Sequence, residues 1–409
     1  MAMTQLALKG GKPIVPGGLY TKWPILDESD AFAVSQALMS GRWCALSHGP
    51  ETYNGQFEAE FANYLGVKYG LLVDNGTNAI ALALKAGEVE AGDEVIVPAV
   101  TFIATATAVI QIGGIPVFAD IDPDTYQIDP SCVRKLVTEK TKAVVPVHYG
   151  GYPANMDEIM EIAEQQNLLV VEDCAEAHGS EWRGKRVGSI GHLGAFSLQQ
   201  GKPLTCGEGG FVCTSDEQLA AKCASYANFG RMPGRPIYEH HVAGYNMRMT
   251  ELQAALVLSQ LKRLPQQTEI RYVNGEYFAS ELEKIGGVDA LKRDPRVTKR
   301  GYYFYFIRYD ASKFKGVSRD RFMQALKGEG IHCGTAHNDP IYQNPVFVEM
   351  KFISGKPVDY TKVHCPVAER VYENEILALG KDFLMEREKV DLVLEAIRKI
   401  KYNVDELLN

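Results

Sequence analysis

From Lys68 to Phe229, short apolar runs alternate with longer stretches of helical periodicity. The runs are rich in Val, Ile and Leu and have no regular polar positions, a pattern typical of strands buried on both faces. Because such strands alternate with helices, the sequence predicts an α/β fold with a largely parallel sheet covered by helices on both sides. The expected strands are 69–73, 94–100, 115–121, 142–149, 168–174, 194–198 and 209–215, and the expected helices between them include 78–87, 101–114 and 155–167.

The pattern changes beyond Thr250. A stretch with helical periodicity runs from there to Leu264, and Pro265 is expected to kink or end it, because proline cannot donate the backbone hydrogen bond of a helix interior. Further helices are expected at 272–285, 319–330 and 388–400, with an aromatic strand at 302–310. We therefore predict a large domain over residues 1–268, which includes an N-terminal arm, and a smaller C-terminal α+β domain over 269–409.

Composition excludes several classes of protein. The chain has 409 residues, 46% of them hydrophobic, and a net charge of −8, with no basic run of the kind that binds nucleic acid. It has neither an apolar span of ~20 residues nor a signal-peptide pattern, so we expect a cytoplasmic protein with no membrane partner. None of its eight cysteines forms a CxxC pair, and we expect reduced, mostly buried thiols and no metal site.

Ligands of an open α/β sheet bind at the carboxyl ends of the strands, so the residues just after each strand are the candidates for chemistry. In the first such stretch, "DNGT" at 74–77, Gly76 would let the backbone approach an anion such as phosphate at the start of a helix. A plain helix N-cap explains the same residues. The chain has no Walker loop and no GxGxxG, which argues against a nucleotide-dependent oxidoreductase. The other stretches that follow strands are 98–102, 148–150, 173 and 197–202.

Two charged residues follow buried strands. A carboxylate at Asp173 needs a cationic partner such as a protonated pyridine nitrogen, although a structural cap or a salt bridge would also meet that need. Lys202 lies in the glycine-rich stretch "FSLQQGKPLTCGEGG". An amine held at a water-poor sheet edge can attack an aldehyde and form a Schiff base, whereas a solvated loop lysine is the simpler interpretation.

These features are stronger together than apart. A phosphate-binding turn, an acid for a ring nitrogen and a Schiff-base lysine on one sheet are what an enzyme dependent on pyridoxal 5′-phosphate (PLP) requires. Asp173 would keep the pyridine nitrogen protonated, so that the ring withdraws electrons from the substrate. Phe102 is placed to stack on that ring, although it would serve equally well as core filler. The sequence therefore predicts PLP as cofactor.

The chain resembles the DegT/StrS-type sugar and cyclitol aminotransferases, a family of PLP-dependent transferase fold type I, over nearly its whole length. The resemblance rests on "VDNGTNA", "VVEDCAEAHGS", "FSLQQGKPLTCGEGG", "GYNMRMTELQAA" and "HCPVAERVYENEILAL". It is closest to the branch that aminates scyllo-inosose or 2-deoxy-scyllo-inosose with glutamine. The resemblance implies an aminotransferase that moves an amino group from glutamine or glutamate to the ketone of a sugar or cyclitol by a ping-pong mechanism.

The resemblance also implies roles for individual residues. Lys202 would carry the cofactor and move the substrate proton, and Asp173 would pair with the ring nitrogen. Asn246 matches a residue that reaches the phosphate from the neighbouring subunit, which implies an obligatory homodimer. The other implied residues are Gly76, Thr77 and Ser197 at the phosphate, Phe102 on the ring, and His337 and Tyr342 on a loop that lines the substrate site in relatives.

Glu176 departs from the family pattern, which has Gln or His at this position near the phenolic oxygen of the cofactor. A carboxylate beside a phenolate would tend to hold a proton, so Glu176 is protonated or directed elsewhere, or the cofactor's electronics differ. Lysine at 202 favours transamination, because family members that act as dehydratases carry histidine there. The alternatives are a deoxysugar dehydratase and a non-catalytic PLP-binding regulator. The sequence neither names the acceptor nor chooses between glutamine and glutamate.

Overall fold

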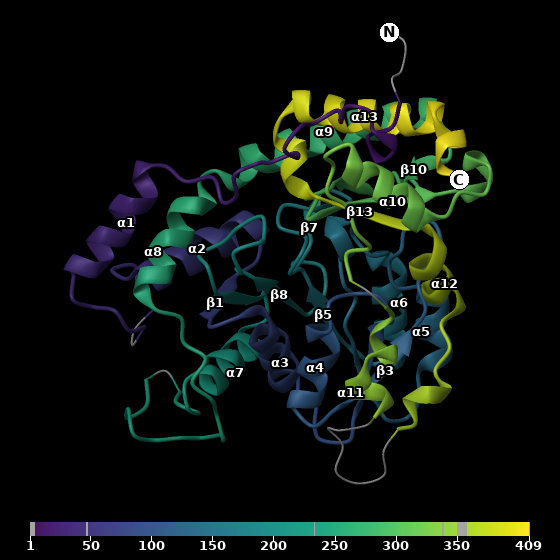
Figure 1. Ribbon diagram of the computed structural model, residues 1–409. Helices are drawn as coiled ribbons and strands as arrows, with labels where there is room; N and C mark the ends of the chain where they lie inside the picture. The colour runs from purple at the N-terminus through teal and green to yellow at the C-terminus, as the bar shows by residue number, and fades with distance from the viewer. Residues whose placement is uncertain (1–4, 46–47, 233, 338, 350–357, 409) are drawn as a thin grey trace.

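The computed structural model describes residues 5–408 except 46–47, 233, 338 and 350–357. A seven-stranded sheet with packed helices forms one part of the molecule. Helices from the C-terminal part of the chain lie over a second, three-stranded sheet (Figure 1). The α/β architecture predicted from the sequence is confirmed.

The large sheet is mostly parallel, as predicted. Its strands, in sheet order, are β1 (Tyr69–Val73), β9 (Gly210–Thr214), β8 (Leu193–Ser197), β5 (Leu169–Asp173), β4 (Thr141–Val144), β2 (Glu94–Pro98) and β3 (Ile115–Ala119). The strand β9 runs antiparallel to both β1 and β8, and the other neighbouring pairs are parallel. The carboxyl ends of β1, β8 and β5 therefore meet at one edge of the sheet.

Both faces of this sheet are covered, which explains the continuous apolar runs of its strands. Val95 and Val97 of β2 belong to a core that includes α3 and α4, whereas Ile96 between them belongs to a core with α6. The helices around the sheet are α1 (Glu28–Met39), α2 (Tyr53–Leu65), α3 (Gly76–Ala86), α4 (Ala104–Gln111), α5 (Pro130–Leu136), α6 (Met156–Gln166), α7 (Glu217–Ala227) and α8 (Glu251–Leu261).

The helical stretch beyond Thr250 breaks at the predicted proline. Helix α8 ends at Leu261, and α9 (Leu264–Ile285) begins with Pro265 in its first turn. Helix α9 then runs without interruption past residue 268, and a domain boundary there stays a prediction.

The C-terminal part has its own core. The strands β10, β12 and β13 form its antiparallel sheet, and the core beneath α10 and α13 also includes Leu6 from the N-terminal segment. The remaining elements are β6 (Glu181–Trp182), β7 (Lys185–Arg186), β10 (Val288–Ala290), β11 (Val297–Lys299), β12 (Phe304–Tyr309), β13 (Ile376–Gly380), α10 (Arg319–Gly328), α11 (Pro345–Val348), α12 (Pro366–Arg370) and α13 (Arg387–Tyr402). In the described part of the chain, no helix has the length and apolarity of a membrane span.

Candidate active site

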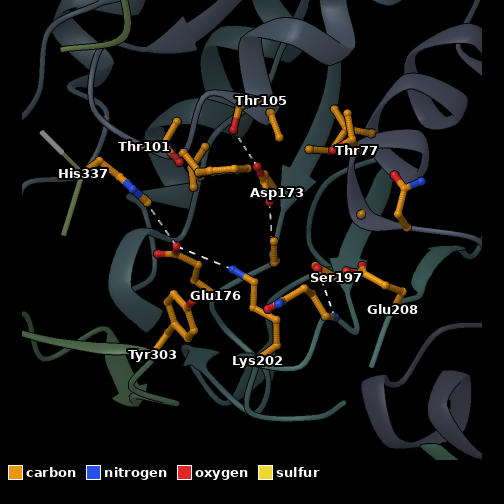
Figure 2. A pocket seen from close by; sticks show the side chains of 18 residues that line it. Thr77, Thr101, Thr105, Asp173, Glu176, Ser197, Lys202, Glu208, Tyr303 and His337 are labelled. Atoms are coloured by element: carbon orange, nitrogen blue, oxygen red, sulfur yellow. Dashed lines mark hydrogen bonds and ion pairs between the residues drawn. The ribbon is translucent and has the colours of Figure 1, made fainter. Parts of the chain in front are cut away.

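A cavity of about 440 Å³ opens at the carboxyl edge of the large sheet (Figure 2). Its walls come from the ends of β1, β5 and β8, from the segment 101–105 after β2, and from two positions of the C-terminal part, Tyr303 and His337. Of the residues predicted from the sequence, those that line the cavity are Gly76, Thr77, Phe102, Asp173, Glu176, Ser197, Lys202 and His337. Asn246 and Tyr342 lie outside it.

The turn after β1 leaves backbone amides free to bind an anion. Asn75 caps α3, and its side chain and carbonyl accept from Asn78 and Ala79. This cap does not use the first amides of the helix, at Gly76 and Thr77, so the cap and the anion site coexist. A Cβ at position 76 would lie 2.7 Å from the Cβ of Ser197, so only glycine lets this turn approach the end of β8 so closely.

Asp173 is a buried carboxylate at the end of β5. It accepts hydrogen bonds from Thr105 Oγ1 at 2.7 Å and from the Ala175 amide at 3.1 Å. Burial raises the pKa of Asp173, and these two donors with Lys202 offset only part of the increase. A cation that enters the cavity would therefore stabilise its ionised form.

Lys202 lies on the turn that follows β8, and its side chain is directed into the cavity (Figure 2). Its amide donates to Gln199 O at 2.8 Å, and the Gly201 amide donates to the Gln199 side chain, which closes the turn. The amine lies 3.7 Å from Glu176 Oε1 and 4.0 Å from the centre of the Tyr303 ring. The side chain is only 12% exposed, so this is not the solvated lysine of the simpler interpretation.

Glu176 points at Lys202 and is held in place by the backbone. Its Oε2 accepts from the Gly150 amide at 2.8 Å, and its Oε1 lies 3.8 Å from His337 Nε2. Burial alone would raise the pKa of Glu176, but Lys202, His337 and the Gly150 amide together hold it below its ordinary value. Of the three alternatives left open by the sequence, a protonated Glu176 is therefore disfavoured here, because two basic groups approach the carboxylate.

The other predicted residues differ in where they lie. Phe102 is 54% exposed, and the centre of its ring lies 5.5 Å from that of His337, so it is not core filler. Tyr342 is buried, and its hydroxyl donates to Glu369 instead of entering the cavity. Asn246 is exposed and pairs through its backbone with Asn228.

Sequence reasoning missed several residues of the site, among them Thr105, Tyr303 and Glu208. Thr105 lies on α4 one turn beyond Phe102, and that helical spacing could have identified it. Tyr303 gave no signal, because it is one of several aromatic residues in "YYFYF". Tyr302 has a φ of 49°, which interrupts the alternation of facing that a strand pattern assumes.

A second buried cluster lies behind the site and consists of His148, Glu172 and Cys174. His148 Nδ1 accepts from the Ala154 amide, and its Nε2 lies 2.9 Å from Glu172 Oε2. Glu172 also accepts from three backbone amides between residues 188 and 191. Because these polar atoms already have partners, we assign the cluster a structural role.

The chain has extensive similarity to known proteins. A model of the DegT/DnrJ/EryC1/StrS aminotransferase family matches residues 24–398. The L-glutamine:scyllo-inosose aminotransferase of Streptomyces griseus is 33% identical, with 99% of each chain covered. The spore coat polysaccharide biosynthesis protein SpsC of Bacillus subtilis (strain 168) is 37% identical, with 93% of this chain and 97% of that protein covered. The X-ray structure of the aminotransferase from Psychrobacter cryohalolentis has a TM-score of 0.86 and 34% identity, and covers 95% of this chain and 100% of its own.

Proposed function

The chain belongs to the DegT/DnrJ/EryC1/StrS aminotransferase family and is an aminotransferase, and we propose that it uses PLP to move an amino group from glutamine or glutamate to the ketone of a sugar or cyclitol. The observation that carries this proposal is the meeting of three groups in one cavity: the Lys202 amine, the Asp173 carboxylate and the anion-binding turn at Gly76. No one of them alone would indicate this chemistry.

The residues present fit the cofactor. The amides of Gly76 and Thr77 with the hydroxyl of Ser197 suit a phosphate group, and Asp173 is a buried acid that a ring cation would stabilise. The half-exposed ring of Phe102 offers a flat face inside the cavity. Among the described residues, the Lys202 amine makes no hydrogen bond that would keep it from an aldehyde, and its partners at 3.7 and 4.0 Å are electrostatic.

When bound, PLP acts as an electron sink for the negative charge that develops on the substrate carbon. The amine of Lys202 would attach the cofactor and, once released, would take up the proton from that carbon and deliver it to the cofactor carbon C4′, with the reverse transfer in the second half of the reaction. Asp173 would balance the positive charge of the ring nitrogen, and Thr105 fixes the orientation of this carboxylate by donating to it. The turn at Gly76 and Ser197 would anchor the phosphate, so that these groups keep their relative positions through both halves of the reaction.

The polar lining of the cavity is compatible with a polyhydroxylated acceptor. Thr101, Gln199, Glu208 and His337 supply hydroxyl, amide, carboxylate and imidazole groups to the walls. A relative named for L-glutamine and scyllo-inosose supports glutamine as donor and a cyclitol as acceptor, whereas a relative named for spore coat polysaccharide supports a sugar. In a ping-pong reaction, the donor leaves as a 2-oxo compound before the ketone enters the same cavity.

A homodimer is part of the proposal. Asn246 is exposed and lies outside the cavity of its own chain, as expected of a residue that serves a neighbouring subunit. Large apolar side chains are exposed on α1 and on the segment just before Asn246, and a second copy would cover them: Phe32, Met39, Ile237 and Tyr238. A cytoplasmic location stays a prediction.

The test is a donor reaction followed by chemical mapping. Incubation of the PLP-loaded protein with glutamine should convert the bound cofactor to pyridoxamine phosphate and release the 2-oxo product, which absorbance and chromatography detect. Borohydride reduction before the donor is added should leave the cofactor on the peptide that contains Lys202. A reduced cofactor on another amine, or on none, would contradict the proposal. A sugar that loses water without gaining nitrogen would indicate the dehydratase instead.

A further inference from the structure

The amine of Lys202 lies between an acid of the large sheet part and an aromatic ring of the C-terminal part. Glu176 Oε1 is 3.7 Å from the nitrogen, and the centre of the Tyr303 ring is 4.0 Å from it (Figure 2). The second distance is within the range of a cation–π interaction, in which the negative face of a ring attracts a positive charge. Both neighbours therefore favour an amine that carries a proton.

One glycine fixes both of these neighbours. The Gly150 amide donates to Glu176 Oε2 at 2.8 Å, and the Gly150 carbonyl accepts from the Tyr303 amide at 3.0 Å. Gly150 has a φ of 65°, and a Cβ there would lie 2.3 Å from the ring of Phe306. The backbone at this point can therefore hold the acid and the ring at a set separation only with glycine.

The other side of the arrangement is fixed by Lys381. Its amine donates to the carbonyl of Gly201, next to Lys202, at 2.8 Å, and its amide donates to the carbonyl of Tyr303 at 3.2 Å. Lys381 thus joins the turn that carries Lys202 to the segment that carries Tyr303. This residue is 4% exposed, so the join is shielded from water.

The two acids of the site have different partners. Asp173 is engaged by Thr105 and Ala175, whereas Glu176 Oε1 has no hydrogen-bond partner among the described residues. His337 approaches the same oxygen at 3.8 Å, without a hydrogen bond. Each acid can therefore serve one positive charge: Asp173 the ring nitrogen, and Glu176 the free lysine.

From these contacts we propose that Glu176 and Tyr303 form a holding site for Lys202, which receives its amine as the ammonium that forms when the released amine takes up the substrate proton. This inference rests on the proposed function, in which Lys202 is released and recaptured in every cycle. The holding site keeps the released amine within reach of the substrate carbon. It also accounts for an acid at position 176, where the family resemblance leads one to expect a neutral side chain or histidine. Glu176 and Tyr303 are positioning residues, because they act through Lys202.

The test measures how fast Lys202 reacts with a small amine reagent in the full-length chain freed of cofactor, by mass spectrometry of its peptide. Near neutral pH, Tyr303→Leu should raise the rate about 2- to 30-fold, because loss of a cation–π contact releases the neutral amine. Tyr303→Phe keeps the ring and should stay within about twofold of the wild type. Glu176→Gln keeps the size and the bond from Gly150 but removes the charge, and should raise the rate as well.

A strongly alkaline measurement separates the charge effect from simple shielding. There the amine is neutral in every variant, so the rates of the Tyr303→Leu variant and the wild type should converge. If the Tyr303→Leu variant still reacted faster than the wild type at alkaline pH, the ring would only block access of the reagent, which would overturn the inference. Equal rates for the Tyr303→Leu and Tyr303→Phe variants near neutral pH would also overturn it. Borohydride mapping of the PLP-loaded wild type is read separately. If it finds no cofactor on Lys202, the proposed function fails. If it finds the cofactor on Lys202 but the variants are labelled as fast as the wild type, only the holding site is contradicted.

Discussion

The two halves of the cavity are fixed in different ways. The sheet half carries Asp173 and Lys202 at the ends of β5 and β8, where ladders of hydrogen bonds join neighbouring strands. The other half carries Tyr303 and His337, and among the described residues the backbone of Tyr303 bonds the sheet part only at Gly150. A ladder holds groups more rigidly than isolated contacts do, because its bonds support one another. We infer that the sheet half performs the chemistry and that the other half adjusts it.

The largest effect is expected from Lys202→Ala. Without the amine, neither attachment of the cofactor nor proton transfer remains, so turnover should fall by about 10⁴-fold or more. Absorbance spectra of the PLP-loaded protein and borohydride mapping provide the measurement. A variant that keeps the colour of attached cofactor would show that another amine does this work.

Lys381→Met is the matched control for that variant. Lys381 is a second buried amine close to the site, since burial lowers its pKa to about 8 even though Asp382 raises it, and its amine lies against the Lys202 turn. We expect the Lys381 variant to keep covalent attachment at Lys202. If borohydride mapping found the cofactor on Lys381 in the wild type and on no peptide of this variant, the roles assigned to the two lysines would be reversed.

Asp173→Asn should have the next largest effect. An amide keeps the shape of the side chain but cannot balance the charge of a ring nitrogen, so kcat should fall on the order of 10²- to 10³-fold. Thr105→Val removes only the donor that orients the carboxylate, and about a tenfold loss is expected. Steady-state kinetics of both variants measure the two losses in kcat. Equal losses would mean that orientation of Asp173, and not its charge, matters.

The sheet half could be predicted from the sequence, and the reason is geometric. Parallel strands place their carboxyl ends at one edge, so Asp173, Ser197 and Lys202 are brought together by topology alone. The aminotransferase and the mostly parallel sheet are confirmed. The direction of Glu176 could not be foreseen, because it depends on the Gly150 amide and on how closely Lys202 approaches.

The other half could not be predicted, since it depends on how the C-terminal part docks. Tyr303 and Tyr305 look alike in the sequence, yet Tyr305 is buried in the second core and Tyr303 faces the cavity. His337 and Tyr342 were both expected at the substrate. The structure brings only His337 to the cavity, because the hydroxyl of Tyr342 is directed to Glu369.

Asn246→Ala tests a contribution to the site from the neighbouring subunit, in addition to those of the two halves of the cavity. If Asn246 donates to the phosphate held by a partner subunit, its loss should weaken cofactor retention about 10- to 100-fold, the worth of a hydrogen bond to a charged group. Dialysis followed by absorbance measures retention, and sedimentation checks that the dimer persists. Unchanged retention in an intact dimer would remove the cross-subunit assignment.

The smallest effect, and the sharpest comparison within the second half, is expected from His337→Ala beside Tyr342→Phe. His337 lines the cavity and contacts Phe102 and Glu176, so its loss should raise the KM for the keto acceptor about 2- to 10-fold with little change in kcat. The hydroxyl of Tyr342 bonds Glu369 outside the cavity, so Tyr342→Phe should lower the free energy of unfolding by about 1 kcal/mol and leave that KM unchanged. Initial rates at varied acceptor and urea unfolding give the two quantities. A larger rise in KM for the Tyr342 variant would mean that the C-terminal half docks differently when the acceptor is bound. A large fall in kcat for the His337 variant would mean that this half takes part in the chemistry, and the distinction between the two halves would then fail.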